Sequence, residues 1–212
     1  MNSALSLRQK RGHRRNKRLS RYQNQGRIVD GLRIDTRPNI VEKRGRIGDF
    51  EVDRIIGGNR KQALVTIVER KTGLALIKKV ERKTAEEVKK AIIDLLTNIK
   101  HSVKTITSDN GLEFAEHKAI ASALDCQYYF AHPYSSWERG SNENLNGLIR
   151  QYFPKRMVFD SISDEEIKAV ENRLNHRSRK RLKYKTPYRA FYSLDSHLDV
   201  EFSFYFYTET YS

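Results

Sequence analysis

The feature that most constrains the fold is a set of three short segments rich in β-branched residues, at 49–56, 63–69 and 74–80. Gly57-Gly58-Asn59 separates the first two segments, and Lys71-Thr72-Gly73 separates the last two. Strands joined by such tight turns are typical of an antiparallel meander. The sequence therefore predicts a sheet that begins with three antiparallel strands.

Downstream, helical and strand patterns alternate. Thr84 with Glu87 is a capping-box pattern, and an apolar stripe at helical spacing follows it. Ser141 is the expected N-cap of the helix after loop 131–140, and Ser163 with Glu166 forms a second capping box. The expected elements are a helix from 84, strand 103–108, helix 116–124, strand 126–130, helix 141–153, helix 164–176, a short helix from Thr186-Pro187 and a strand over 198–208. This order predicts an α/β body.

The charge is distributed unevenly along the 212 residues, which carry a formal net charge of +15. Residues 1–46 hold 14 basic and 3 acidic side chains, residues 47–172 hold 19 of each, and residues 173–212 hold 8 and 4. A neutral middle with basic flanks is typical of a folded body with polyanion-binding extensions. We therefore expect a basic arm over 1–46, a core over 47–193 and a tail of unknown role over 194–212.

The N-terminal arm is expected to be extended, because the run from Arg8 to Arg18 is highly charged and poor in apolar residues. We expect four of its cations to contact phosphate: Arg14, Arg15, Lys17 and Arg18. The alternatives are a solvated charge run and, less well supported, an organelle transit peptide, since residues 8–29 have few apolar side chains.

Several classes of protein are excluded by composition. Cys126 is the only cysteine, so a disulfide framework and a cysteine-based zinc site are both ruled out. No run of about 18 apolar residues exists, and no signal-peptide pattern begins the chain. We expect a cytoplasmic protein in a reducing compartment, without a membrane partner.

Three carboxylates occupy positions where side chains can converge. Asp53 lies in the first strand, Asp109 closes the fourth, and Glu143 lies in the first turn of the helix after the fifth. Each has an ordinary alternative: an edge-strand charge for Asp53, an Asx-turn residue for Asp109 and a macrodipole-stabilising acid for Glu143. On the helical wheel, Glu143 points away from the apolar stripe of Leu145, Leu148, Ile149 and Tyr152.

Converging carboxylates repel one another unless a cation joins them. Hard oxygen ligands suit Mg²⁺ or Mn²⁺, and two such ions about 3.5–4 Å apart can activate a water or a 3′-hydroxyl for attack on a phosphodiester. Together with the basic flanks, this predicts phosphoryl transfer on nucleic acid.

Three blocks resemble the catalytic motifs of DDE transposases, and the closest similarity is to the bacterial insertion sequence thirty family. They are Gly48–Asp53, Thr107–Phe114 and Pro133–Gly147; Arg150–Pro154 and the stretch from Leu174 to Pro187 also fit. The resemblance implies a ribonuclease H-like (integrase catalytic core) fold, with a mixed five-stranded sheet and helices on both faces. It further implies a metal-binding triad of Asp53, Asp109 and Glu143, DNA cleavage and strand transfer during transposition, and a homodimer or higher oligomer on element ends and target DNA.

Further residues receive roles through this resemblance. Arg150, on the same side of its helix as Glu143, is expected to contact phosphate. Weaker candidates for DNA contacts are Arg139, Lys155, Lys78 and Lys79, for each of which the alternative is a solvated side chain. Trp137 and Tyr134 are expected to anchor the loop before Glu143, and the alternative is that they contact a base.

Two features depart from the family pattern. Phe50 replaces the family's usual Trp, and residues 1–46 lack the periodicity of the family's N-terminal helix-turn-helix region. We therefore consider a truncated or separately encoded transposase, or a relic. The rival functions are a DNA-binding regulator without catalysis and, less favoured, a ribonuclease H-type nuclease.

Overall fold

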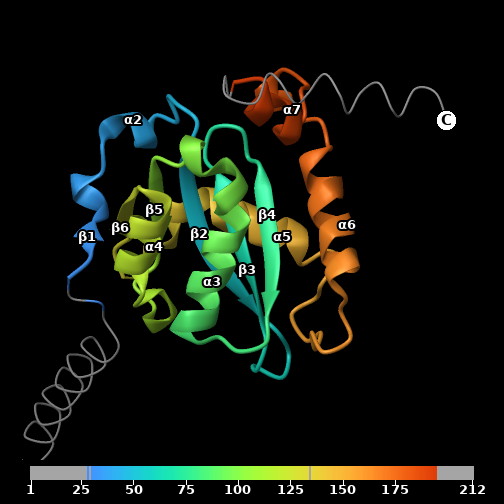
Figure 1. Ribbon diagram of the computed structural model, residues 1–212. Helices are drawn as coiled ribbons and strands as arrows, with labels where there is room; N and C mark the ends of the chain where they lie inside the picture. The colour runs from blue at the N-terminus through green and yellow to red at the C-terminus, as the bar shows by residue number, and fades with distance from the viewer. Residues whose placement is uncertain (1–27, 29, 134, 195–212) are drawn as a thin grey trace, which may run out of the picture.

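A computed structural model describes residues 28, 30–133 and 135–194, which build a mixed sheet with helices on both faces (Figure 1). The strand order is β1-β6-β5-β2-β3-β4. β2, β3 and β4 form the predicted antiparallel meander, whereas β1, β6, β5 and β2 run parallel. The strands are β1 Leu32–Arg33, β2 Asp49–Ile56, β3 Ala63–Glu69, β4 Ala75–Val80, β5 Thr105–Ser108 and β6 Gln127–Phe130.

The prediction of five strands is wrong by one, because β1 adds a sixth strand to the described sheet. This two-residue strand pairs with β6, with Leu32 opposite Tyr129. Residues 34–46 continue into a 3-10 turn, η1 (Ile34–Thr36), and a short helix, α2 (Asn39–Glu42). The side chains of Arg37 and Val41 are buried. The arm is therefore not extended over residues 30–46, whereas Arg14, Arg15, Lys17 and Arg18 lie outside the described residues.

Among the helices after α2, three begin at a residue whose side chain caps the first turn, and two begin without such a cap. The helices are α3 Ala85–Leu96, α4 His117–Leu124, α5 Gly140–Ile149, α6 Asp164–Asn175 and α7 Pro187–Tyr192; the 3-10 turns after α3 are η2 Thr97–Ser102, η3 Leu112–Phe114, η4 Ser136–Arg139 and η5 Lys180–Leu182. Ser163 forms a complete capping box with Glu166. Thr186 caps α7 with Pro187 in its first turn.

The prediction for Ser141 is wrong. α5 begins at Gly140, directly after the η4 turn, and no side chain caps it. The Ser141 hydroxyl instead accepts a hydrogen bond from Arg44. α5 also ends at Ile149, short of the expected residue 153.

Alternation along the strands creates two cores. Phe50 and Val52 of β2 face the core beneath α3, α4 and α7, whereas Ile55 faces a second core beneath α5 and α6. Phe50, which stands where the family usually has Trp, is fully buried beside Phe191. The opposite face of β2 carries Asp49, Glu51 and Asp53, so the strand's acids lie on the α5 side of the sheet.

Two further predictions concern the C-terminal segment and membrane-spanning helices. The expected strand at 198–208 lies outside the described residues, as does the tail beyond Leu194. In the part of the chain that the structure describes, no helix is long and apolar enough to cross a membrane.

Candidate active site

Asp49 and Glu51, on the same face of β2 as Asp53, are committed to structural contacts. Asp49 accepts hydrogen bonds from Arg46 and from the Thr105 hydroxyl. Glu51 is fully buried. It accepts a 2.5 Å hydrogen bond from Arg70 and another hydrogen bond from the backbone N–H of Asn142. Glu51 thus fixes the first turn of α5 against the sheet.

Asp53 lies at the centre of a small polar cluster. Its Oδ1 accepts a hydrogen bond from the Arg54 backbone N–H at 2.8 Å, and its Oδ2 accepts one from Asn146 Nδ2 at 3.0 Å. Asn146 in turn accepts a hydrogen bond from the Thr66 hydroxyl. Sequence reasoning missed Asn146, although its place three residues after Glu143 puts it near that acid on the helix surface.

Asp109 follows β5 and has two roles. Its Oδ1 accepts a hydrogen bond from the Gly111 N–H at 3.2 Å, which is the Asx-type turn considered as its ordinary alternative. Its Oδ2 lies 3.5 Å from Nη2 of Arg139. The turn therefore orients the carboxylate while leaving one oxygen directed at the site.

Arg139 bridges the two aspartates. Nη1 lies 3.3 Å from Asp53 Oδ2, while Nη2 approaches Asp109. Its side chain is 13 % exposed, so the guanidinium is largely withdrawn from water. The structure thus places Arg139 against carboxylates, whereas we had expected a phosphate contact.

The electrostatics of the pair favour a cation. Burial raises the pKa of Asp53, the nearby carboxylate of Asp109 adds to the rise, and the Arg139 guanidinium opposes it. Two carboxylates that share a partly buried site stay ionised together only if positive charge lies between them. Their oxygens are the donors that Mg²⁺ and Mn²⁺ prefer, so the pair fits such an ion.

Glu143 stands apart from this pair. Its side chain is exposed, on the opposite side of α5 from the buried Leu145 and Ile149, as the helical wheel predicted. Among the described residues, no group of three or more His, Cys, Asp or Glu side chains is arranged to hold a metal ion. The structure therefore brings together Asp53 and Asp109, and the third member of the triad stays a prediction.

The other expected DNA contacts differ in their surroundings. Arg150 donates to the carbonyls of Ile56, Phe153 and Pro154, so it joins the end of α5 to β2. Lys155 is exposed. Lys78 pairs with Asp94, and Lys79 donates to the Ile162 carbonyl. Tyr134 and the side chain of Trp137 lie outside what the structure describes, so their anchoring role stays a prediction.

Comparison with solved structures defines the fold class. The chain is similar to the catalytic core domain of bovine immunodeficiency virus (BIV) integrase, with a TM-score of 0.56 and 19% identity, covering 71% of this chain and 97% of that one. A chain of the simian T-cell lymphotropic virus intasome, in complex with PP2A regulatory subunit B56 gamma, gives a TM-score of 0.54, also at 19% identity, over 77% of this chain and 56% of that one. The fold is that of the ribonuclease H-like integrase catalytic core.

The sequence relatives are transposases of insertion sequences. The transposase for insertion sequence element IS4351 of Bacteroides fragilis is 46% identical over 194 residues, covering 92% of this chain and 60% of the relative. The transposase InsI for insertion sequence element IS30A of Escherichia coli K12 is 36% identical over 161 residues, covering 76% and 42%. No family model matches the chain. Over most of its own length the chain is similar to IS30-type insertion-sequence transposases, and it spans less than two thirds of the length of these relatives.

Proposed function

We propose that residues 47–193 form a catalytic core that cleaves DNA at the ends of an insertion sequence and joins the freed strand to target DNA. The observation that carries this proposal is the Asp53–Asp109 pair. The two residues come from neighbouring strands of an integrase-type sheet, and the Arg139 guanidinium lies between their oxygens. In this proposal Asp53, Asp109 and Glu143 hold two divalent ions, Mg²⁺ or Mn²⁺. Two bound ions supply activation of the attacking oxygen and stabilisation of the leaving oxygen.

The chain's own residues have distinct parts in this reaction. Asn146 holds Oδ2 of Asp53, and the Arg54 N–H holds Oδ1, so that carboxylate is oriented before any ligand arrives. The Asx turn at Gly111 does the same for Asp109. Glu143 lies on the exposed side of α5, where it can approach the pair from the solvent side. Asn146 and Arg139 are positioning residues, since they act through the aspartates.

Similarity to the transposases also supports a DNA partner. We propose that the chain acts on DNA as a homodimer or higher oligomer, because joining two element ends requires that both be held together. The proposed compartment is the bacterial cytoplasm, with the protein bound to the nucleoid.

A cleavage assay tests the proposed reaction. The purified chain is incubated with end-labelled duplex DNA carrying the element terminus and with Mg²⁺ or Mn²⁺, beside Asp109→Asn and Glu143→Gln variants. Metal-dependent nicking and joining by the wild type, reduced at least about 100-fold in both variants, is the expected result.

The rival function has a specific observation in its favour, because Glu143 stands apart from the aspartate pair. If wild type and both variants bind DNA equally and none cleaves it, the chain is a DNA-binding regulator. If only Glu143→Gln retains wild-type cleavage, the third ligand is misassigned.

A further inference from the structure

The loop that joins α6 to α7 is strongly basic, and the site described above does not use it. Residues 177–185 hold six cations, Arg177, Arg179, Lys180, Arg181, Lys183 and Lys185. No Asp or Glu occurs anywhere from 172 to 194. Five of the six side chains are exposed, and Arg179 is half-buried.

Backbone hydrogen bonds hold this loop in a defined shape. Arg179 N–H donates to the Lys185 carbonyl, and the Tyr184 N–H donates back to the Arg179 carbonyl. Lys183 and Tyr184 are in the left-handed region, at φ 52° and 65°. The Tyr184 side chain is 72 % exposed. The left-handed region is unfavourable for a large aromatic residue, and here its ring faces solvent.

The loop joins further cations near the start of α5. Arg181 Nη1 donates to the Lys71 carbonyl at 2.7 Å, and Lys71 Nζ donates to the Gly45 carbonyl at 3.0 Å. Arg44, the residue before Gly45, donates to the Ser141 hydroxyl in the first turn of α5. A chain of contacts therefore runs from the loop to a position two residues before Glu143.

Positive charge in this region is poorly compensated. Partial burial lowers the pKa of Arg181, and the charges of Arg44 and Arg179 lower it further. Glu69 is the acid that opposes this shift, but it is fully buried and accepts hydrogen bonds from Thr72. Like charges held in proximity favour a bound polyanion.

We propose that loop 177–185, with Arg44 and Lys71, forms a basic surface that binds the sugar-phosphate backbone of the DNA being cleaved. Tyr184 provides an aromatic face for an unpaired base or sugar on the same strand. That the bound polyanion is DNA rests on the proposed function. None of the residues of this surface belongs to the acid site, and Figure 1 shows α7 and the adjoining loop at the same end of the sheet as α2, away from the β2–β3 turn.

Binding without catalysis tests the surface. Fluorescence anisotropy of a labelled 30-base-pair duplex is measured in EDTA across a range of salt, with the full chain and a Lys180→Ala/Lys183→Ala/Lys185→Ala variant. Loss of three phosphate contacts lowers the slope of log K against log salt by about 3. At 0.1 M salt we expect affinity to fall at least about tenfold.

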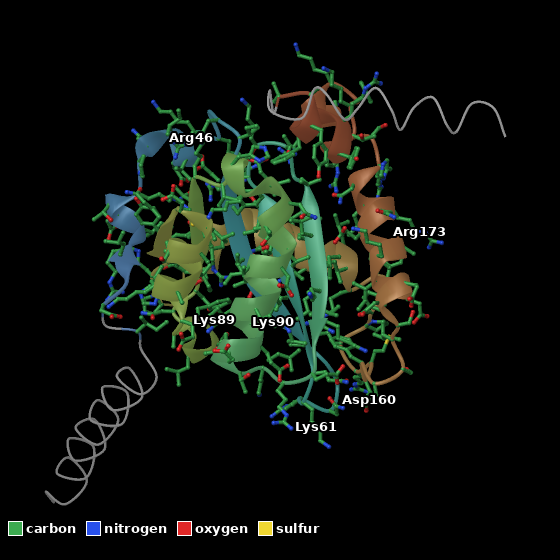
Figure 2. All side chains as sticks on the ribbon, viewed as in Figure 1. Arg46, Lys61, Lys89, Lys90, Asp160 and Arg173 are labelled. Carbon is green, nitrogen blue, oxygen red and sulfur yellow. The ribbon has the colours of Figure 1, made fainter. Side chains whose placement is uncertain are left out.

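A matched control carries the same change in net charge. Lys61, Lys83 and Lys90 are exposed, and Figure 2 shows Lys61 and Lys90 well away from α7. The Lys61→Ala/Lys83→Ala/Lys90→Ala variant is expected to keep a slope within about 1 of wild type. If both triple variants lose slope equally, binding depends on net charge alone and the proposed surface is wrong.

Tyr184→Gly separates stacking from folding. Glycine adopts the left-handed region readily, so thermal stability is not expected to fall. Affinity for a single-stranded oligonucleotide is expected to fall about fivefold or more. Unchanged affinity would overturn the role of Tyr184. Every binding measurement is made in EDTA, so it does not depend on cleavage. A negative cleavage assay would therefore not contradict DNA binding by this surface, and a negative binding test would not contradict the proposed cleavage.

Discussion

Nη1 of Arg139 lies 3.3 Å from Oδ2 of Asp53, although the two residues belong to a 3-10 turn and a strand far apart in sequence. The guanidinium supports the ionised state of a carboxyl group whose pKa is raised by burial. Through Asp109 it also connects β5 to the turn that precedes α5. Arg139 therefore links the two aspartates across the site.

Arg139→Gln is expected to make the thermal stability of the chain depend more strongly on added metal. Without the guanidinium the two aspartates repel, so the melting temperature in EDTA should fall by about 2–4 °C, equivalent to about 1 kcal/mol. Stabilisation by added Mn²⁺ should be larger than in the wild type. Differential scanning fluorimetry measures both quantities, with Arg139→Lys as the charge-retaining control. If Mn²⁺ raised the melting temperature of all three proteins equally, Arg139 would not be the cation that offsets the repulsion between the two aspartates.

The loop before α5 is expected to be sensitive to pH. His132 lies between Glu138 and Asp35, and their carboxylates raise its pKa. A raised folded pKa gives stability that is fully present below about 6.5 and is lost as pH rises through the folded value. The difference in melting temperature between wild type and His132→Gln should therefore shrink from pH 6 to pH 9. A difference that stays constant over this range would exclude the titration.

The buried pair of Arg70 and Glu51 is expected to be essential for stability. Arg70→Met leaves the fully buried Glu51 without its charge partner, which typically costs about 3–5 kcal/mol. Urea denaturation measures the loss, and Glu51→Gln/Arg70→Met should lose less because no charge remains buried. Lys78→Met, at an exposed pair, is the control and should cost under about 1 kcal/mol. Equal losses in Arg70→Met and Lys78→Met would refute this account.

Cys126 is expected to be a poorly reactive thiol. Burial raises its pKa to about 12, and the charge of Asp125 adds to the shift. Since the thiolate is the reactive species, alkylation by iodoacetamide at pH 8 should be at least about tenfold slower in the folded chain than in urea. Mass spectrometry follows this reaction cleanly, because the sequence has a single cysteine. Equal rates would show that the thiol is not desolvated.

Much of the fold could be predicted because its signals are local. The meander follows from β-branched runs between turn residues, and the capping box at Ser163 follows from spacing alone. β1 could not be predicted, since two residues carry no periodicity and the strand exists only through its pairing with β6. Arg37 was missed for the same reason: it lies in a basic segment, yet it is buried and donates to Thr107.

The site could be predicted in its components but not in its contacts. The position of Asp53 follows from its place in a β-branched strand, and that of Asp109 follows from a strand end and its turn. That Arg139 and Asn146 both contact Asp53 depends on how α5 lies along β2, which no local pattern encodes. Arg150 shares the side of α5 that carries Glu143 on the helical wheel, but the early end of the helix lets it bind backbone carbonyls instead.

Cleavage by an Asp109→Cys variant tests whether the acid pair binds the metal during catalysis. Thiolate is a poor ligand for Mg²⁺ and a better one for softer metals such as Mn²⁺. Nicking of element-end DNA should therefore be lost with Mg²⁺ and partly recovered with Mn²⁺, relative to wild type in the same metal. Undiminished nicking by the variant in Mg²⁺ would contradict the account, because Asp109 could not then be a ligand of the catalytic metal.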